Sequence, residues 1–471
     1  MSNLDLVIRN GTMVTAVEQV QCDIGIKDGR VALLGQNLEG NETIDATDRL
    51  VLPGGVDSHV HIAERPFYGV RSADDFESGS ISAACGGTTT LIPFAEQIKG
   101  ETLRKAVDDY HSEAEGKAVI DYAFHMMITD VNEQILGQEL PALIEDGYTS
   151  LKVYMTYDGM VLNDREILDT LAVARENGAL VMIHAENDHC IHWLTDKLTR
   201  EGKTALEYYP DMAPAAVERE ATHRAITLAE VVDVPVLIVH VSASDAAEQI
   251  HWAQQRGIKI FGETCPQYLF VTEDDIRQPG WEGAKYLCAP VPRDKINQEL
   301  LWRGIATGVF QVFSSDHCSF LFEGNEGKKN RGPEPHFRHV APGLPGLETR
   351  QALLFSEGVG KGRIDIHTFV AVCATNPAKI YGLYPRKGTI AVGSDADIAI
   401  WDPEREITIT IDKLHDNMDF TPYEGMTIKG WPVMTLSRGE VVCNEGEVLA
   451  KPGRGKFLRC EKSALARPVA S

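Results

Sequence analysis

The sequence has no hydrophobic run that approaches the roughly 20 apolar residues a membrane-spanning helix needs. Its first residues, Met1–Asp5, also lack the basic start and apolar core of a secretory signal. Positive charge is scarce, since 45 Lys and Arg stand against 69 Asp and Glu and leave a net charge of −24. Such an acidic chain is a poor partner for nucleic acid or an anionic membrane. We therefore expect a soluble cytoplasmic protein with neither partner.

The nine cysteines are spread along the chain, and none forms a C-x-x-C pair. Paired spacings and even counts are typical of thiolate zinc sites and disulfide frameworks. Their absence favours reduced thiols in a reducing compartment. Cys288 and Cys318 are expected to be buried and inert.

Both ends of the chain have the pattern of short strands joined by tight turns. Near the start, we predict a hairpin of strands 4–9 and 12–15 across Asn10-Gly11, and a second of strands 23–27 and 31–34 across Asp28-Gly29. Further strand patterns near the end lie at 396–401, 433–436, 441–442 and 448–449. We predict one small β-sandwich built from residues 1–52 and 386–450. Residues 451–471 would form a tail that could contact a neighbouring subunit.

The middle of the chain, residues 53–385, alternates strand and helix patterns. Strands are predicted near 56–61, 88–94, 119–127, 149–155, 179–184, 235–241, 257–263 and 309–315. Helices between them include 164–177, with Asn163 as its N-cap, 215–232 and 244–256. Eight strands, each followed by a crossover, predict an α/β fold of the (β/α)8 TIM type. The alternative, a doubly wound open sheet, usually has a Gly-rich phosphate turn after its first strand, and none is present.

In such a barrel the reactive groups lie where the strands end. His59 and His61, two residues apart, point to the same side of the first strand and can bind one metal ion together. A single histidine is more often an ordinary core residue, but here five predicted strand ends carry a candidate ligand. The set is His59, His61, Lys152, His184, His240 and Asp316. His189-x-x-His192 and His336-x-x-His339 lack such positions, and we interpret them as chance.

Four imidazoles and one carboxylate suit one or two divalent ions such as Zn²⁺. Two neighbouring ions would share a bridging anion and generate hydroxide at neutral pH. An ammonium at Lys152 would be repelled by them, so this lysine either is neutral, carries CO₂ as an anionic carbamate that bridges the ions, or forms an unrelated salt bridge. Asp316 could move a proton from water to a leaving nitrogen. The hydroxyl of Tyr157 could stabilise an oxyanion, or the ring could simply pack in the wall.

Several segments carry a resemblance to a known family. They are Pro53–His61, Ser150–Tyr157, His184–Asn187, His240–Ser242, Glu263–Leu269, Ser314–Cys318, Gly343–Glu348, Asn376–Lys379 and Lys387–Asp397. Together they resemble the cyclic amidohydrolases, and the chain is most similar to the dihydropyrimidinase/D-hydantoinase branch. The resemblance covers residues 4–460.

The resemblance implies a site with two zinc ions, Mn²⁺ and Co²⁺ being alternatives. The ligands it implies are His59, His61, His184, His240, Asp316 and Lys152 as N6-carboxylysine. It also implies that Tyr157 stabilises the tetrahedral intermediate and that the enzyme is a homotetramer. The implied reaction is hydrolytic ring opening of a small cyclic amide. Dihydropyrimidines would give N-carbamoyl-β-amino acids, and 5-substituted hydantoins would give N-carbamoyl amino acids.

Two positions depart from the family pattern. Ala289 stands where the family commonly has Ser, and Pro342 stands where it commonly has Asn. Family members hold the edge of the ring with main-chain groups here; Ala289 keeps both groups, whereas Pro342 keeps only its carbonyl. Phe67, Tyr68 and Met160 resemble residues that hold the ring substituent, although local packing explains them equally well.

Because of these two departures, other ring-opening enzymes remain as alternatives, namely allantoinase, cyclic-imide hydrolase or another cyclic-ureide hydrolase. A non-catalytic scaffold on the same fold would have lost metal ligands, whereas every ligand position is intact here.

Overall fold

The computed structural model describes residues 4–332 and 334–468, so the outermost residues of both predicted terminal segments lie outside the described part. Its centre is a parallel sheet with the strand order β16-β15-β14-β13-β12-β11-β9-β8-β17, and β10 pairs with β9. The strands are β8 (Gly55–His61), β9 (Thr88–Glu96), β10 (Asp121–Tyr122), β11 (His125–Met127), β12 (Ser150–Tyr154), β13 (Leu180–His184), β14 (Val236–Ile238), β15 (Ile260–Thr264), β16 (Val312–Phe313) and β17 (His317–Cys318).

The sheet closes through the stretch 312–318, which contains both β16 and β17. β16 pairs with β15, and β17 pairs with β8. The parallel strands therefore form a TIM-type barrel. Each of the eight predicted strands overlaps an observed one, but 119–127 splits into β10 and β11, and 309–315 contains only the short β16.

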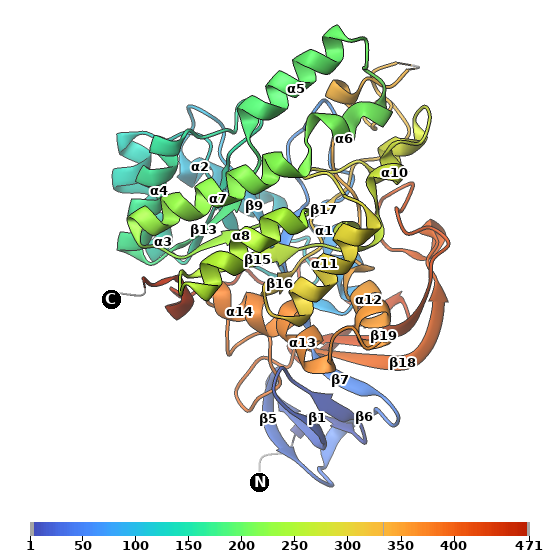
Figure 1. The fold of residues 1–471 in the computed structure, drawn as a ribbon. Coiled ribbons are helices and arrows are strands. Elements are labelled where there is room, and N and C mark those ends of the chain that lie inside the picture. Colours follow the sequence, from blue (N-terminus) through green and yellow to red (C-terminus); the bar gives the residue numbers. More distant parts are fainter. Residues whose placement is uncertain (1–3, 333, 469–471) are drawn as a thin grey trace.

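Helices connect the strands and cover the outside of the barrel (Figure 1). They are α1 (Phe76–Cys85), α2 (Leu103–Ala114), α3 (Leu140–Glu145), α4 (Asp164–Asn177), α5 (Asp188–Arg200), α6 (Tyr209–Met212), α7 (Ala215–Val232), α8 (Ser244–Gln255), α9 (Gln267–Phe270), α10 (Glu273–Ile276), α11 (Lys295–Ala306), α12 (Arg350–Leu354), α13 (Ile366–Val370) and α14 (Asn376–Ile380). The predicted helices 164–177 and 215–232 are confirmed, and 244–256 ends one residue early. Asn163 caps α4, since its side chain accepts from the backbone N–H of Arg165 and Glu166.

Strands from both ends of the chain form two further sheets. A four-stranded sheet has the order β5-β4-β1-β6, and a seven-stranded sheet has the order β21-β20-β19-β18-β7-β2-β3. They comprise β1 (Leu4–Arg9), β2 (Thr12–Val14), β3 (Gln19–Gln21), β4 (Asp23–Lys27), β5 (Arg30–Gly35), β6 (Gly40–Asp45), β7 (Leu50–Pro53), β18 (Ile398–Thr408), β19 (Thr427–Ser437), β20 (Glu440–Asn444) and β21 (Glu447–Val448). β7 pairs with β18, which joins the two ends of the chain in one sheet. One apolar cluster contains Ile8 and Ile24 from the first sheet and Ile398 and Leu436 from the second.

The predicted hairpin across Asn10-Gly11 is wrong. β1 pairs with β4 and β6, whereas β2 pairs with β3 and β7, so the two strands lie in different sheets. The dipeptide therefore connects strands of two different sheets. Glycine is needed at its second position, because a Cβ on Gly11 would lie 2.5 Å from Cγ2 of Val51. The second predicted hairpin, across Asp28-Gly29, is confirmed by the antiparallel pairing of β4 with β5.

The described part of the C-terminal tail packs on the barrel of its own chain. The backbone nitrogens of Gly455, Leu458 and Cys460 donate to main-chain carbonyls of the barrel at 2.8, 2.7 and 3.0 Å. Contact of this tail with a neighbouring subunit stays a prediction.

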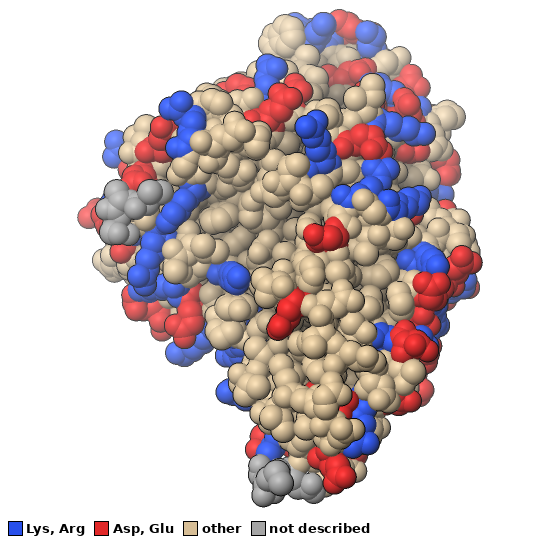
Figure 2. All heavy atoms as spheres, turned by 60° about the horizontal axis from the view of Figure 1, so that its bottom comes forward, with Lys and Arg blue, Asp and Glu red and all other residues tan. Residues whose placement is uncertain are grey.

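The helices and the surface charge bear on whether the protein binds a membrane or another subunit. Over residues 4–332 and 334–468, no helix has the length and apolarity needed to span a membrane. Figure 2 shows a face whose centre is made mainly of uncharged side chains, with most Lys, Arg, Asp and Glu towards its margins.

Candidate active site

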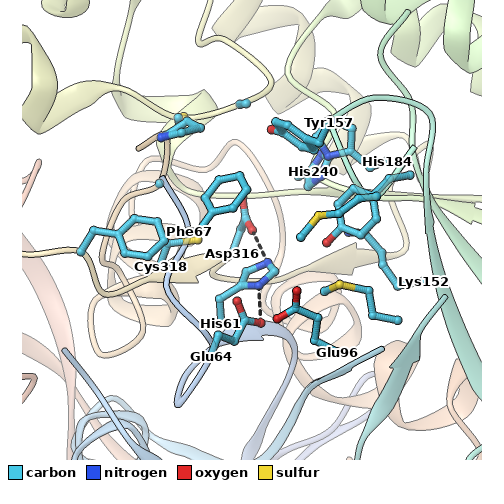
Figure 3. Close-up of a pocket in the computed structure, with 18 of the residues that line it drawn as sticks. His61, Glu64, Phe67, Glu96, Lys152, Tyr157, His184, His240, Asp316 and Cys318 are labelled. Atoms are coloured by element: carbon cyan, nitrogen blue, oxygen red, sulfur yellow. Dashed lines mark hydrogen bonds and ion pairs between the residues drawn. The ribbon is translucent and has the colours of Figure 1, made fainter. Parts of the chain in front are cut away.

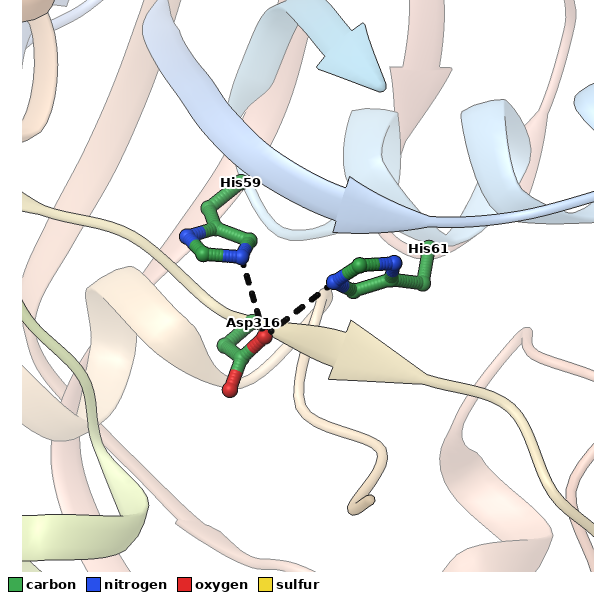
Figure 4. A group of neighbouring side chains, drawn as sticks. All are labelled: His59, His61 and Asp316. Carbon is green, nitrogen blue, oxygen red and sulfur yellow. Dashed lines mark ion pairs between the residues drawn. The ribbon is translucent and has the colours of Figure 1, made fainter. Parts of the chain in front are cut away.

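Two strands that lie far apart in the sequence bring three candidate ligands together. His59 and His61 lie at the end of β8, and Asp316 lies just before β17, which pairs with β8. One carboxylate oxygen of Asp316 is 3.3 Å from Nε2 of His59 and 3.5 Å from Nε2 of His61 (Figure 4). The ligand atoms of all three residues lie within 4.8 Å of one another, a spacing that one divalent ion can bridge.

The outward nitrogens of both imidazoles are held by carboxylates. Nδ1 of His59 donates to Glu263 at 2.7 Å, and Nδ1 of His61 donates to Glu64 at 2.7 Å. This arrangement turns both Nε2 atoms towards Asp316, the side on which a metal ion could bind. Burial acts to lower the pKa of His61, but Glu64 and Asp316 outweigh it and raise that pKa to about 9.

Lys152, in the middle of β12, is fully buried beside these ligands. Its Nζ lies 3.3 Å from Nε2 of His59 and 5.1 Å from the ring centres of Phe94 and Tyr154. Burial lowers the pKa of this amine to about 8. Among the described residues Lys152 has no salt bridge, so the alternative of an ordinary ion pair finds no partner.

His184 and His240 complete the cluster from the ends of β13 and β14. Their ring centres are 4.4 Å apart, and His240 lies 5.3 Å from His59. Nε2 of His184 is paired with Glu186 at 2.9 Å, whereas the buried Nδ1 of His240 has no partner among the described residues. Burial lowers the pKa of His240 well below its usual value, so its ring is neutral and suited to bind a metal.

Three of the candidate residues have a strained backbone. Tyr157, His240 and Asp316 adopt φ angles of 78°, 37° and 49°, in a region that residues other than glycine rarely occupy. Such conformations persist only where the surrounding structure enforces them, and they are typical of functional sites. The strain therefore supports a functional role for these three positions.

A cavity of about 90 Å³ opens above the cluster (Figure 3). Ten of the predicted residues line it, namely His61, Phe67, Lys152, Tyr157, Met160, His184, His240, Ala289, Asp316 and Pro342. His59 does not line the cavity, because it is buried behind His61. Tyr68 lines an adjoining cavity of about 490 Å³ that shares Phe67, Tyr157, Ala289 and Pro342 with the first.

Several carboxylates of this site were not predicted from the sequence. Glu64 and Glu96 line the cavity, while Glu186 and Glu263 lie behind the histidines. Burial raises the pKa of Glu96 to about 7. Their positions in the sequence could have indicated them. Glu96 and Glu263 lie at or next to the end of a strand, and Glu186 follows His184 by two residues.

Cys288 and Cys318 also line the cavity. Burial raises the pKa of both thiols, which keeps them protonated and unreactive at neutral pH.

The main chain at the two unusual positions is available for binding. Among the described residues, no protein group forms a hydrogen bond with the N–H or C=O of Ala289 or with the C=O of Pro342. Both residues line the cavity, so a bound ring could use all three groups.

The fold and this donor set define a class of protein. A barrel with imidazoles, a buried lysine and an aspartate at its strand ends is the architecture of a metal-dependent hydrolase. Residues 50–442 match the amidohydrolase family, and the chain belongs to it.

Three relatives place the chain within that family. It is 44% identical to the D-hydantoinase of Rhizobium radiobacter over 98% of this chain and 99% of the relative. It is 45% identical to the D-hydantoinase of Geobacillus stearothermophilus over 97% and 96% of the two chains. The crystal structure of dihydropyrimidinase from Brevibacillus agri NCHU1002 superposes with a TM-score of 0.94 at 42% identity, over 97% of this chain and 99% of that one. The protein is a cyclic amidohydrolase of the D-hydantoinase and dihydropyrimidinase group.

Proposed function

We propose that this protein opens the ring of 5-substituted hydantoins and of 5,6-dihydropyrimidines by hydrolysis, giving N-carbamoyl amino acids and N-carbamoyl-β-amino acids. The observation that carries the proposal is the convergence of His59, His61 and Asp316 beside the buried Lys152, which has no salt bridge among the described residues. A carboxylate and imidazoles around a small cavity are suited to metal-assisted attack of water on an amide carbonyl.

The donor set fits two divalent ions, with Zn²⁺ as our first choice and Mn²⁺ or Co²⁺ as alternatives. We propose that His59, His61, Lys152, His184, His240 and Asp316 hold them. Two ions bound there would lower the pKa of a shared water molecule and supply hydroxide at neutral pH.

We propose that Lys152 is carboxylated. The neutral amine would attack the carbon of CO₂, form an N–C bond and release a proton, leaving an anionic carbamate. Burial supports this step, because it lowers the pKa of Lys152 to about 8 and makes the neutral amine accessible near physiological pH. The carbamate would also remove the positive charge that repels a metal.

The remaining chemistry falls to Asp316 and Tyr157. Asp316 would accept a proton from the attacking water and pass it to the leaving ring nitrogen. Burial raises the pKa of Tyr157 well above its usual value, so its hydroxyl keeps the proton it would donate to the oxyanion.

We propose that main-chain groups at Ala289 and Pro342 hold the ring, while Phe67, Tyr68 and Met160 surround its substituent. Phe67 and Met160 line the same cavity as the metal-binding candidates, and Tyr68 lines the adjoining one. Because two of the three named relatives are D-hydantoinases, we expect a preference for the D form.

A kcat/KM panel tests the assignment. It compares dihydrouracil, both enantiomers of phenylhydantoin, allantoin, dihydroorotate and succinimide with metal-loaded enzyme. We expect dihydrouracil and phenylhydantoin to be the best substrates. Failure on both would overturn the proposal, and a clear preference for allantoin or succinimide would favour one of the other ring-openers.

We also propose a homotetramer of cytoplasmic subunits, each with a β-sandwich (1–52 and 386–450), a barrel (53–385) and a tail (451–471). The weakly charged face in Figure 2 and the free thiols of all nine cysteines support this. Light scattering during gel filtration would measure the mass, and a monomer at micromolar concentration would contradict the tetramer.

A further inference from the structure

Lys328 is a fully buried lysine that has no ion-pair partner among the described residues. Its ammonium group donates to the main-chain carbonyls of Ala284 at 2.8 Å and Gly343 at 2.7 Å, and it lies 3.4 Å from that of Leu287. Burying a charge without a counter-ion costs free energy, so a lysine at such a position calls for an explanation. Burial lowers the pKa of this amine to about 7.

Lys387, the other buried lysine outside the catalytic cavity, provides a contrast. Its ammonium is paired with the carboxylates of Asp121, Asp395 and Asp397 at 2.8, 3.1 and 2.7 Å. That environment is typical of a lysine that serves stability alone, because the charge is matched. Lys328 instead uses its donors only on carbonyl groups of the main chain.

Those carbonyls belong to two segments that meet behind the ring-binding edge of the cavity. Leu287 leads into Cys288 and Ala289, and Gly343 follows Pro342. The two segments are joined by one direct hydrogen bond, in which the N–H of Gly343 donates to the carbonyl of Leu287 at 2.9 Å. Lys328, which does not line the cavity, adds contacts to both segments.

The segment after Pro342 has little room to move. A Cβ on Gly343 would lie 2.5 Å from Cβ of Cys318, so glycine alone fits there. Main-chain groups cannot adjust by changing rotamer, unlike the side chains of Ser or Asn. The spacing between Ala289 and Pro342 therefore depends on whatever holds the two backbones.

We propose that Lys328 is a positioning residue that sets the spacing of the two main-chain segments holding the substrate ring. The inference rests on the proposed function in one respect, the assignment of Ala289 and Pro342 as the ring-binding edge. Lys328 does not contact the metal ligands and does not line the cavity, so it acts on ring binding and not on the chemical step.

The test is Lys328→Met, which preserves most of the side-chain volume and removes every donor. We expect KM for the best ring substrate to rise at least tenfold, kcat to stay within threefold, and bound metal to remain at the wild-type level. A rise in KM alone identifies lost binding that is shared by the ground state and the transition state. A merely structural role would lower the thermal midpoint without this split.

Lys329→Met is the matched control, because Lys329 is the next residue, pairs with Glu323 at the surface and does not reach the cavity. Its KM should equal that of the wild type. An unchanged KM in folded, metal-loaded Lys328→Met would overturn the inference, as would a fall in kcat with KM unchanged.

Lys328→Gln keeps an amide donor with a shorter reach and decides the question if the Met variant does not fold. If KM of Lys328→Gln lies between the wild-type value and ten times that value, the result supports a positioning role for Lys328. A wild-type KM, or failure of both variants to fold, assigns Lys328 to stability. Turnover by the wild type in the same assay tests the proposed function separately, because the inference concerns only the ratio between variant and wild type.

Discussion

Glu263 links β15 to a residue of β8 and to a residue just after β14 through one carboxylate oxygen. Its Oε1 accepts from Nδ1 of His59 at 2.7 Å and from the backbone N–H of His240 at 3.0 Å. Glu263 lies in β15, His59 in β8, and His240 just after β14. This contact fixes the ring of His59 so that Nε2 faces Asp316 and Lys152.

Glu263→Gln should therefore weaken metal binding by about 10- to 100-fold, the usual cost of losing a carboxylate behind a metal-binding histidine. Competition with a chromogenic chelator would measure the affinity. Glu273→Gln, which changes a half-buried carboxylate on α10 that is paired with Arg277, is the control and should bind metal like the wild type. Equal affinity in the two variants would contradict an orienting role for Glu263.

Lys152→Ala should abolish activity, because the variant cannot form a carbamate to bridge the ions. Short-chain carboxylic acids should restore part of the activity by placing a carboxylate in the vacated space. The measurement is turnover against acetate or propionate concentration, with chloride at equal ionic strength as the control. Full activity in the variant without added acid would rule out the bridging role.

Tyr157→Phe should lower kcat by about 10²- to 10³-fold while KM changes little, since one donor to a developing oxyanion typically contributes this much. Steady-state kinetics on the preferred substrate measures both constants. Tyr208→Phe removes a hydroxyl outside the cavities and should leave both unchanged. If kcat of the Tyr157 variant falls less than threefold, its hydroxyl does not stabilise the transition state.

Metal removal should abolish activity without unfolding the barrel, because the ligands are held by hydrogen bonds and packing that need no ion. Prolonged dialysis against a chelator, followed by circular dichroism and activity measurements, tests this. Adding Zn²⁺, Mn²⁺ or Co²⁺ should then restore turnover. Undiminished activity in protein shown to be metal-free would refute a metal-dependent mechanism.

His415 should make stability depend on pH on the alkaline side. A hydrogen bond to Glu348, partly opposed by burial, raises the pKa of His415 from its usual value near 6.5 to about 9. The charged ring is thus favoured in the folded state, so its contribution is complete below pH 6.5 and is lost as pH rises through 9. Burial also raises the pKa of Glu348.

Thermal midpoints of the wild type and His415→Gln, measured from pH 6 to 9.5, test this linkage. The advantage of the wild type should shrink as pH rises through this range. A constant difference between the two proteins would show that the contact does not titrate there.

Much of the barrel could be predicted from the sequence, because buried parallel strands are short apolar runs separated by amphipathic helices. The helices 164–177 and 215–232 agree with the structure residue for residue. The hairpin across Asn10-Gly11 failed, because a turn dipeptide reports only a local reversal of backbone direction. Which strands pair afterwards depends on segments that come later in the chain, such as β7, which pairs with β2, and β6, which pairs with β1.

The candidate site, too, contains residues that could be predicted from the sequence and residues that could not. His59, His61, Lys152, His184, His240 and Asp316 could be predicted because each lies in a strand or shortly after one, a position that the local pattern reveals. The partners Glu64, Glu186 and Glu263 were missed, since a carboxylate near a strand end is common and its meaning depends on which imidazole it faces. The placement of Tyr68 beside the adjoining cavity likewise needed the folded loops.

The sequence by itself determined the order of strands and helices and the types of metal-binding side chain, because hydrophobic periodicity and residue chemistry are local properties. Only the tertiary structure decided that Glu263 holds His59, that Lys152 is buried without a counter-ion, and that Lys328 joins the segments behind Ala289 and Pro342. Each of these relationships joins side chains and backbone groups brought together by folding, and their energies depend on distance and burial that no linear pattern contains.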